Sequence, residues 1–165
     1  MNGGPTQTVA LEDGSPAIDT GDNAVCAALP PTGLGKVDQR GIARFRHGDN
    51  LCDIGAFEFI TLLVRPTFKW FGFEPVGQQT RSQQVSVTNN QATSVTLSRS
   101  IGGTNPGAFR IVSTSCGTSL APDTSCTIAI AFKPGAAGKR LALLTVSDNP
   151  DRTSPYQVAL IGVGT

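Results

Sequence analysis

The chain has 165 residues, of which 39% are hydrophobic and only 15% are charged, and it contains 19 Gly and 11 Pro residues. Soluble domains usually carry about 25% charged residues. This composition favours short strands joined by many turns, as in secreted β-proteins, over a helical cytosolic enzyme. The net charge of +1 argues against nucleic acid as a partner. No apolar run reaches the ~18 residues that a membrane span requires.

The charge is distributed unevenly along the chain. Residues 1–60 contain four Lys and Arg against eight Asp and Glu, a net charge of −4, whereas residues 61–165 contain nine against four, a net charge of +5. Such an asymmetry predicts two units of different origin, with a boundary near residue 60. Residues 1–5 have neither the basic nor the apolar region of a signal peptide, so we expect any export signal to lie on preceding sequence of a longer protein.

Residues 1–59 have little hydrophobic periodicity, and turn signals occur every few residues. The apolar groups between the turns are short: Val9–Leu11, Ala17–Ile18 and Ile54–Phe57. This is too little apolar material for an independent core, even with a disulfide. We therefore expect the segment to pack against a neighbour.

Four motifs occur in order within this segment, and their residues are Asn2–Thr8, Gly14–Gly21, Asp38–Gly41 and Cys52–Glu58. Together they resemble the end of secreted right-handed β-helix proteins of the polymorphic-outer-membrane and choice-of-anchor Q types. The resemblance implies that residues 1–60 are the last rungs and the cap of a solenoid. It also implies that an upstream β-helix of the same polypeptide is their partner, because rungs bury a core only by stacking.

Residues 60–66 are predicted to be a short junction, after which the apolar residues alternate with period two. The predicted strands are Thr67–Phe71, Gln83–Thr88, Val95–Ile101, Phe109–Ser113, Cys126–Phe132, Arg140–Ser147 and Tyr156–Ile161. Seven such strands indicate an immunoglobulin-like sandwich over residues 61–165. The predicted core residues are Val85, Val87, Cys126, Ile128, Ile130, Phe132, Leu144 and Val146. The fold class is therefore all-β, a seven-stranded sandwich preceded by a loop-rich β-helix cap.

The same stretch contains Phe71-Gly72, Val85–Asn89, Cys116-Gly117 and Leu160–Gly162 in an order that resembles bacterial choice-of-anchor D and ASH (abnormal-spindle-type) modules. These modules are related in fold to the PapD-like sandwiches, so the resemblance implies a non-enzymatic immunoglobulin-like domain. Lys69 departs from the pattern, which has an apolar residue two positions before Phe71. The departure places Phe68 and Trp70 on the face opposite to Phe71.

The four cysteines divide evenly between the two halves, Cys26 with Cys52 and Cys116 with Cys126. Four cysteines allow three connectivities, and pairing within each half is the simplest. Zinc is the competing interpretation, but the chain has no C-x-x-C pair and a single histidine, His47. Disulfides imply an oxidising compartment, so we expect the protein to be extracellular, at the cell surface, or in the periplasm or outer membrane.

Catalytic constellations are weak in this sequence. His47 lies in a loop rich in Gly, Asn and Asp, and no G-x-S-x-G turn is present, so we interpret it as a surface loop residue. The acidic side chains weighed as a glycosidase-type pair are Asp19, Asp22, Asp38 and Asp53. Each lies beside turn residues, where carboxylates ordinarily bond to backbone, and Asp38 is expected to pair with Arg40. The Asp-rich turns at residues 19–23 and 148–151 lack a calcium-loop spacing, so we predict no catalytic residue, metal ligand or cofactor.

Phe68 and Trp70 are the candidate contact residues. An exposed Trp70 would stack on a sugar ring or mark a protein interface, whereas a buried one would pack at the junction with residues 1–60. The sequence predicts a non-enzymatic surface module that spaces, anchors or contacts a protein or polysaccharide at the cell surface. The alternatives are the accessory tail of a β-helix polysaccharide-active enzyme and a carbohydrate-binding module that uses Trp70.

Overall fold

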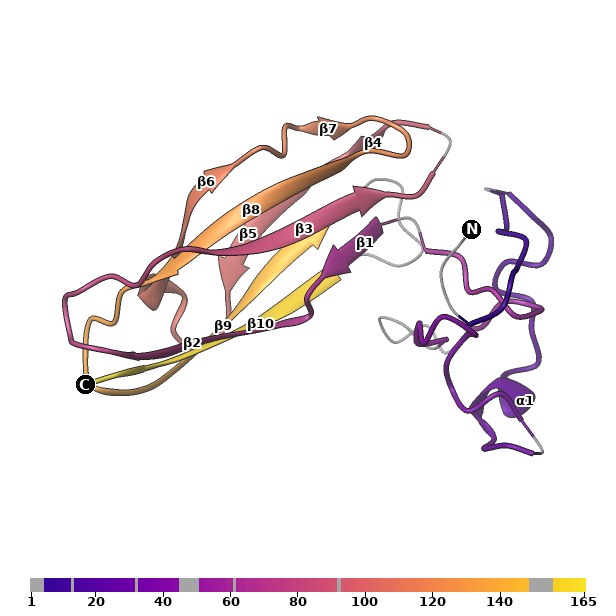
Figure 1. Cartoon of the computed structure of the whole chain (residues 1–165), viewed down its shortest axis with the longest axis horizontal. Helices are drawn as coiled ribbons and strands as arrows, with labels where there is room; N and C mark the ends of the chain where they lie inside the picture. The colour runs from indigo at the N-terminus through magenta and orange to yellow at the C-terminus, as the bar shows by residue number, and fades with distance from the viewer. Residues whose placement is uncertain are drawn as a thin grey trace. The chain divides into compact units, whose positions relative to one another are not determined.

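The computed structural model describes residues 5–12, 14–31, 33–44, 51–60, 62–91, 93–148 and 156–165. The chain forms two compact units, Met1–Ile60 and Thr61–Thr165. The strands of the described residues all belong to the second unit, and the short helix α1 belongs to the first (Figure 1). Within this part of the chain, no helix is both long and apolar enough to cross a membrane.

The second unit is a sandwich of two four-stranded sheets (Figure 1). In the order of its strands, the first sheet contains β1 (Leu62–Arg65), β3 (Gln83–Asn89), β8 (Ser125–Phe132) and β6 (Phe109–Thr114). The second contains β2 (Phe68–Glu74), β10 (Tyr156–Gly164), β9 (Gly138–Ser147) and β5 (Ser98–Gly102). A two-stranded ribbon of β4 (Val95–Thr96) and β7 (Ser119–Leu120) and the 3-10 helix η1 (Pro106–Ala108) complete it. Strands β2 and β10 are parallel, and the other pairs are antiparallel.

Alternating apolar residues form the core between the sheets, because successive side chains of a strand point to opposite faces. All eight predicted core residues are buried. At one end, Phe71, Phe109 and Phe132 form an aromatic cluster in which the ring centroids are 4.9–6.2 Å apart. The all-β, immunoglobulin-like class is therefore supported by the packing as well as by the pattern.

Three details of the strand prediction are wrong. Residues 62–65, expected to lie in a junction, form β1, which pairs with β3 and extends the first sheet. The single strand expected at Val95–Ile101 is two strands, because the chain changes partners around the buried Leu97: β4 pairs with β7, and β5 pairs with β9. The short strand β7 (Ser119–Leu120) was not predicted either, so the described residues contain ten strands and not seven.

The first unit is held mainly by turns. Helix α1 (Asn23–Ala27) begins at Asp22, whose carboxylate accepts hydrogen bonds from the backbone N–H groups of Ala24 and Val25 at 2.8 and 3.2 Å. The only other regular pairing among its described residues is an isolated antiparallel bridge between Val37 and Ala43. The described residues of this unit form no strand that could serve as a β-helix rung. The interpretation of residues 1–60 as a β-helix cap therefore stays a prediction.

The close approach of β10 to the aromatic cluster generates a stability prediction. A Cβ atom on Gly162 would lie 2.6 Å from Cε1 of Phe132, whose ring is packed among two other aromatic rings. We expect Gly162→Ala to lower the free energy of unfolding by about 1–3 kcal/mol, as overpacking does. Gly135→Ala is the matched control, because a Cβ there meets nothing within 4 Å. Urea unfolding of both variants measures the difference, and equal midpoints would contradict the prediction.

Candidate functional site

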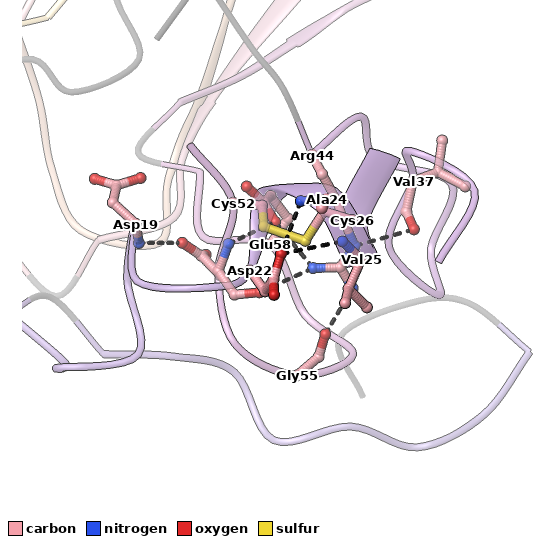
Figure 2. The surroundings of a disulfide bond; sticks show 11 residues. Asp19, Asp22, Ala24, Val25, Cys26, Val37, Arg44, Cys52, Gly55 and Glu58 are labelled. Carbon is pink, nitrogen blue, oxygen red and sulfur yellow. Dashed lines mark hydrogen bonds and ion pairs between the residues drawn. A yellow bond between two sulfur atoms is a disulfide. The ribbon is translucent and has the colours of Figure 1, made fainter. Parts of the chain in front are cut away.

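Both expected disulfides are present, so the zinc interpretation is wrong. Cys26 and Cys52 are joined by an S–S bond of 2.11 Å, and Cys116 and Cys126 by one of 2.02 Å. Figure 2 shows that the first of these lies among the charged side chains of residues 1–60. It links α1 to the segment that carries Asp53 and therefore fixes two parts of this small unit to each other.

The Arg44 guanidinium is the centre of the charged cluster in residues 1–60. It is almost fully buried, and its Nη1 donates to Oε2 of Glu58 at 3.2 Å and to the carbonyl of Asp53 at 3.1 Å. Its Nη2 donates to the carbonyl of Gly55 at 2.6 Å, and its Nε donates to the carbonyl of Val37 at 3.2 Å (Figure 2). One side chain therefore joins Val37 to the segment of residues 53–58.

Asp38 and Asp53 are bound mainly by backbone N–H groups. The Asp53 carboxylate accepts from the N–H groups of Asp19, at 2.8 Å, and Phe59. The Asp38 carboxylate accepts from the N–H groups of Arg40, Ile42 and Glu58 at 2.8–3.0 Å. The predicted pairing of Asp38 with Arg40 is confirmed, at 2.6 Å between Oδ2 and Nη2.

The pKa values of these carboxyls are shifted in opposite directions. Burial and the nearby Asp53 raise the pKa of Glu58 to about 8, and burial also raises the pKa of Asp53. Burial acts in the same sense on Asp38, but the hydrogen bonds from Glu58, Ile42 and Arg40 outweigh it and hold the pKa of Asp38 below its usual value. Three carboxyls with two guanidinium partners give a charge imbalance that one retained proton would remove.

The cluster does not have the form of a general acid and base pair facing a substrate groove. Its carboxyls are engaged by backbone N–H groups and arginines, and Asp22 caps a helix. Arg44 and Glu58 were not singled out from the sequence, although Glu58 ends the Cys52–Glu58 motif. His47 and the turn residues 149–151 lie outside the described residues, so the interpretations placed on them stay predictions.

The second candidate is the outward face of the β2-β10-β9-β5 sheet. Phe68 and Trp70 lie on this face with 49% and 43% of their surface exposed, and Phe73 joins them at 70%. A β-bulge explains the third aromatic: two residues of β2 separate Trp70 from Phe73, where one residue of β10 separates their partners Ile161 and Val163. Gly72, in the bulge, has a φ of +81°, a conformation that suits glycine.

The residues beside Phe68 and Trp70 on this face are apolar as well. The register places Phe68 beside Ala159 and Leu143, and Trp70 beside Ile161 and Leu141, in two rows across the sheet. Residues 103–104, 141–143 and 159–161 line a shallow hollow of about 220 Å³. That is below the ~300–1,000 Å³ of typical small-molecule pockets, so the hollow is a shallow depression in the surface of the sheet.

Simple alternation did not identify Phe73 as a surface residue. Phe71 and Phe73 are two residues apart and would share a face in a regular strand, yet Phe71 is buried and Phe73 is exposed. The signal in the sequence was Gly72, because an isolated glycine in a strand pattern indicates a bulge. The bulge brings the rings of Trp70 and Phe73 into an edge-to-face pair with centroids 5.8 Å apart and an interplanar angle of 88°.

Comparison with known families is decisive for the second unit. Residues 60–165 match the family model described as Cep192 domain 4. The chain belongs to the Cep192 domain 4 family. This membership supports the expected ASH-like, immunoglobulin-like domain, and the β-helix and choice-of-anchor parts of the resemblance remain expectations. None of the curated proteins matches the chain.

Solved structures show the same fold as this Cep192 domain 4 member. A protein of unknown function from Porphyromonas gingivalis W83 is 19% identical with a TM-score of 0.51, and the match covers 62% of this chain and 46% of that one. A family 123 glycoside hydrolase from Clostridium perfringens is 10% identical with a TM-score of 0.52, over 64% of this chain and 27% of that one. The PapD-like domain 7 of human CEP192 is 15% identical with a TM-score of 0.49, and the match covers 64% of this chain and 85% of that one. The first two matches span less than half of the other chain.

The raised pKa of Glu58 predicts that stability in residues 1–60 falls as the pH rises. Between pH 4.5, the ordinary pKa of this carboxyl, and about pH 8, the folded form holds a proton that the unfolded form has released. The free energy of unfolding of residues 1–60 should fall across this window, by at most about 1.4 kcal/mol per pH unit. The raised pKa of Asp53 acts in the same direction, whereas the lowered pKa of Asp38 contributes only below its usual value of 3.8.

Hydrogen exchange of the Asp53 and Phe59 amides in the full chain, corrected for the intrinsic rate, measures this dependence. Glu58→Gln is the matched variant, because the amide keeps the shape of the side chain but does not titrate. Between pH 5 and 8, the free energy of unfolding derived from exchange should fall less steeply with pH in Glu58→Gln than in the wild-type protein. An equal slope in both proteins would show that another group is responsible.

Proposed function

We propose that this chain is a non-catalytic contact module of a larger extracellular, cell-surface or periplasmic protein. Its contact surface is the outward face of the β2-β10-β9-β5 sheet, hereafter the aromatic face, defined by Phe68, Trp70, Phe73, Leu141 and Ile161. The observation that carries the proposal is the exposure of three aromatic side chains on one side of a rigid sheet. Contiguous apolar patches on soluble proteins commonly mark interaction sites.

The covalent and polar structure supports the proposed compartment and the proposed non-catalytic role. The two disulfides support an oxidising location, as expected for an exported protein. The clustered carboxyls of Asp38, Asp53 and Glu58 bind arginines and backbone N–H groups, which supports a structural role for them. Membership of the Cep192 domain 4 family supports a module that acts by contact.

Residues 1–60 are proposed to cap the end of a β-helix in the parent polypeptide. They bury few apolar side chains and expose several aliphatic ones, among them Val9, Leu29 and Ile54. A disulfide and a buried charge cluster take the place of a large apolar core. Terminal repeats of solenoids are atypical in this way, because one of their faces receives the neighbouring rung.

The proposal predicts different behaviour for the two units expressed separately. Residues 61–165 should show a single cooperative unfolding transition, because they contain the complete sandwich core. Residues 1–60 should show no cooperative transition without a neighbouring rung. Circular dichroism melts under non-reducing conditions test both expectations. A cooperative transition of residues 1–60 alone would contradict the cap interpretation.

The proposal also predicts adhesion without turnover. Labelled full-length protein should bind to envelope preparations of the organism that encodes it, and Trp70→Ser together with Phe73→Ser should reduce that binding at least about 10-fold. Both side chains are exposed, so the double variant should keep the unfolding midpoint of the wild-type protein. The matched control is Val112→Ser, an exposed apolar residue on β6 in the other sheet. Binding that the double variant retains, or turnover of envelope polysaccharide, would refute the proposal.

A further inference from the structure

We propose that the aromatic face, together with the basic end of the sandwich beside it, binds an acidic polysaccharide, a sugar polymer that carries carboxylates. This inference rests on the proposed contact function and names the partner of the same surface. Three features support it: the fixed arrangement of the aromatic rings, a lysine on the same face, and the excess of positive charge around that end of the sheet.

The aromatic rings are held in place before any ligand arrives. Phe68 and Trp70 are two residues apart on one face of β2, which is about 7 Å along a strand. The rings of Trp70 and Phe73 pack against each other in an edge-to-face arrangement. Gln83 donates a hydrogen bond to the Trp70 carbonyl at 2.7 Å and fixes the backbone of this edge strand. Flat apolar ring faces at such spacing suit the C–H faces of successive sugar rings.

A cation lies on the same face as these rings. The register pairs Phe73 with Val163 and Val163 with Lys139, so the three side chains form one row across β2, β10 and β9. Adjacent strands are about 4.8 Å apart, which places the Lys139 backbone roughly 10 Å from that of Phe73. Lys139 is exposed. A carboxylate on a sugar stacked against the aromatic rings would fall within reach of its ammonium group.

Further cations lie at this end of the sandwich. The N–H of Thr80 donates to the carbonyl of Phe132, and this bond brings the exposed Arg81 close to the exposed Lys133. The described residues of the second unit carry eight Lys and Arg against three Asp and Glu. Of these three acids, Asp148 is buried, Asp123 is exposed in the loop between β7 and β8, and Glu74, which follows Phe73, is partly exposed at this end. The surface is therefore complementary to a negatively charged partner.

The combination distinguishes a sugar polymer from a protein with a plain apolar patch. An apolar partner would gain its affinity from the aliphatic residues around the hollow, and its binding would depend little on salt. An acidic polysaccharide would need both the rings and Lys139, and its affinity would fall as salt rises. The open, shallow form of the hollow suits a ligand that lies across the surface and extends beyond it.

The probe is polygalacturonate, with fully methyl-esterified polygalacturonate as the matched polymer without charge. Affinity electrophoresis of the full chain should show retardation by the charged polymer and at least about 10-fold weaker binding to the ester. Trp70→Ala should weaken binding about 10-fold, and Lys139→Ala should weaken it about 3-fold and reduce its dependence on salt. Val112→Ala and Arg110→Ala, both on β6 in the other sheet, should bind as the wild-type protein does. Unfolding midpoints verify that each variant is folded.

Equal binding to both polymers, no binding to either, or binding that survives both Trp70→Ala and Lys139→Ala would overturn the inference. These failures are separable from failure of the contact function. If polygalacturonate does not bind but envelope binding persists, depends on Trp70 and is abolished by protease treatment of the envelope, the partner is a protein and only the inference is wrong. If sedimentation velocity shows self-association that Trp70→Ala abolishes, the partner is a second copy, and again only the inference is wrong.

Discussion

The pairing of β10 on both of its edges is the constraint on which the second unit depends. Strand β10 pairs in parallel with β2 and antiparallel with β9. The alternation of its side chains between the two faces of the sheet therefore decides which side chains of both neighbours face outward. Its inward residues Val158 and Leu160 are completely buried, so a slip by one residue would expose them and is strongly disfavoured. The rows of outward residues on β2 and β9 are therefore fixed by burial on the opposite face.

The first unit obtains its order from a different source. Where the sandwich has a continuous apolar core, residues 1–60 have a disulfide, a buried guanidinium with four hydrogen-bond acceptors, and carboxylates that bind backbone N–H groups. Interactions of this kind fix the geometry of loops, and they depend on each member being present, because an unpaired buried charge is costly. The two units therefore depend on different features: the sandwich on the volume of its core, and the first unit on proton concentration and on its Cys26–Cys52 disulfide.

The sequence was sufficient for the features that follow from alternation and from simple pairing. The core residues from Val85 to Val146, both disulfides and the Asp38–Arg40 pair were predicted correctly. Strand β1 was missed because the run Leu62–Arg65 is only four residues long and ends at a proline, so its pairing with β3 depends on the tertiary structure. The buried Arg44 was missed because three of its partners are backbone carbonyls of two separate segments, which no local pattern records. Phe73 was missed because a bulge changes the period within a single strand.

That bulge has a consequence for how the contact surface could evolve. In a regular strand the residue two positions after Trp70 would share its side of the sheet, and that residue is Gly72; because of the extra residue in β2, Phe73 takes this place instead. Deletion of Gly72 would make the strand regular and leave Phe73 opposite Val163, since β10 is paired on both edges and keeps its register. The bulge can thus be lost in one mutational step without redesign of the buried half of the domain.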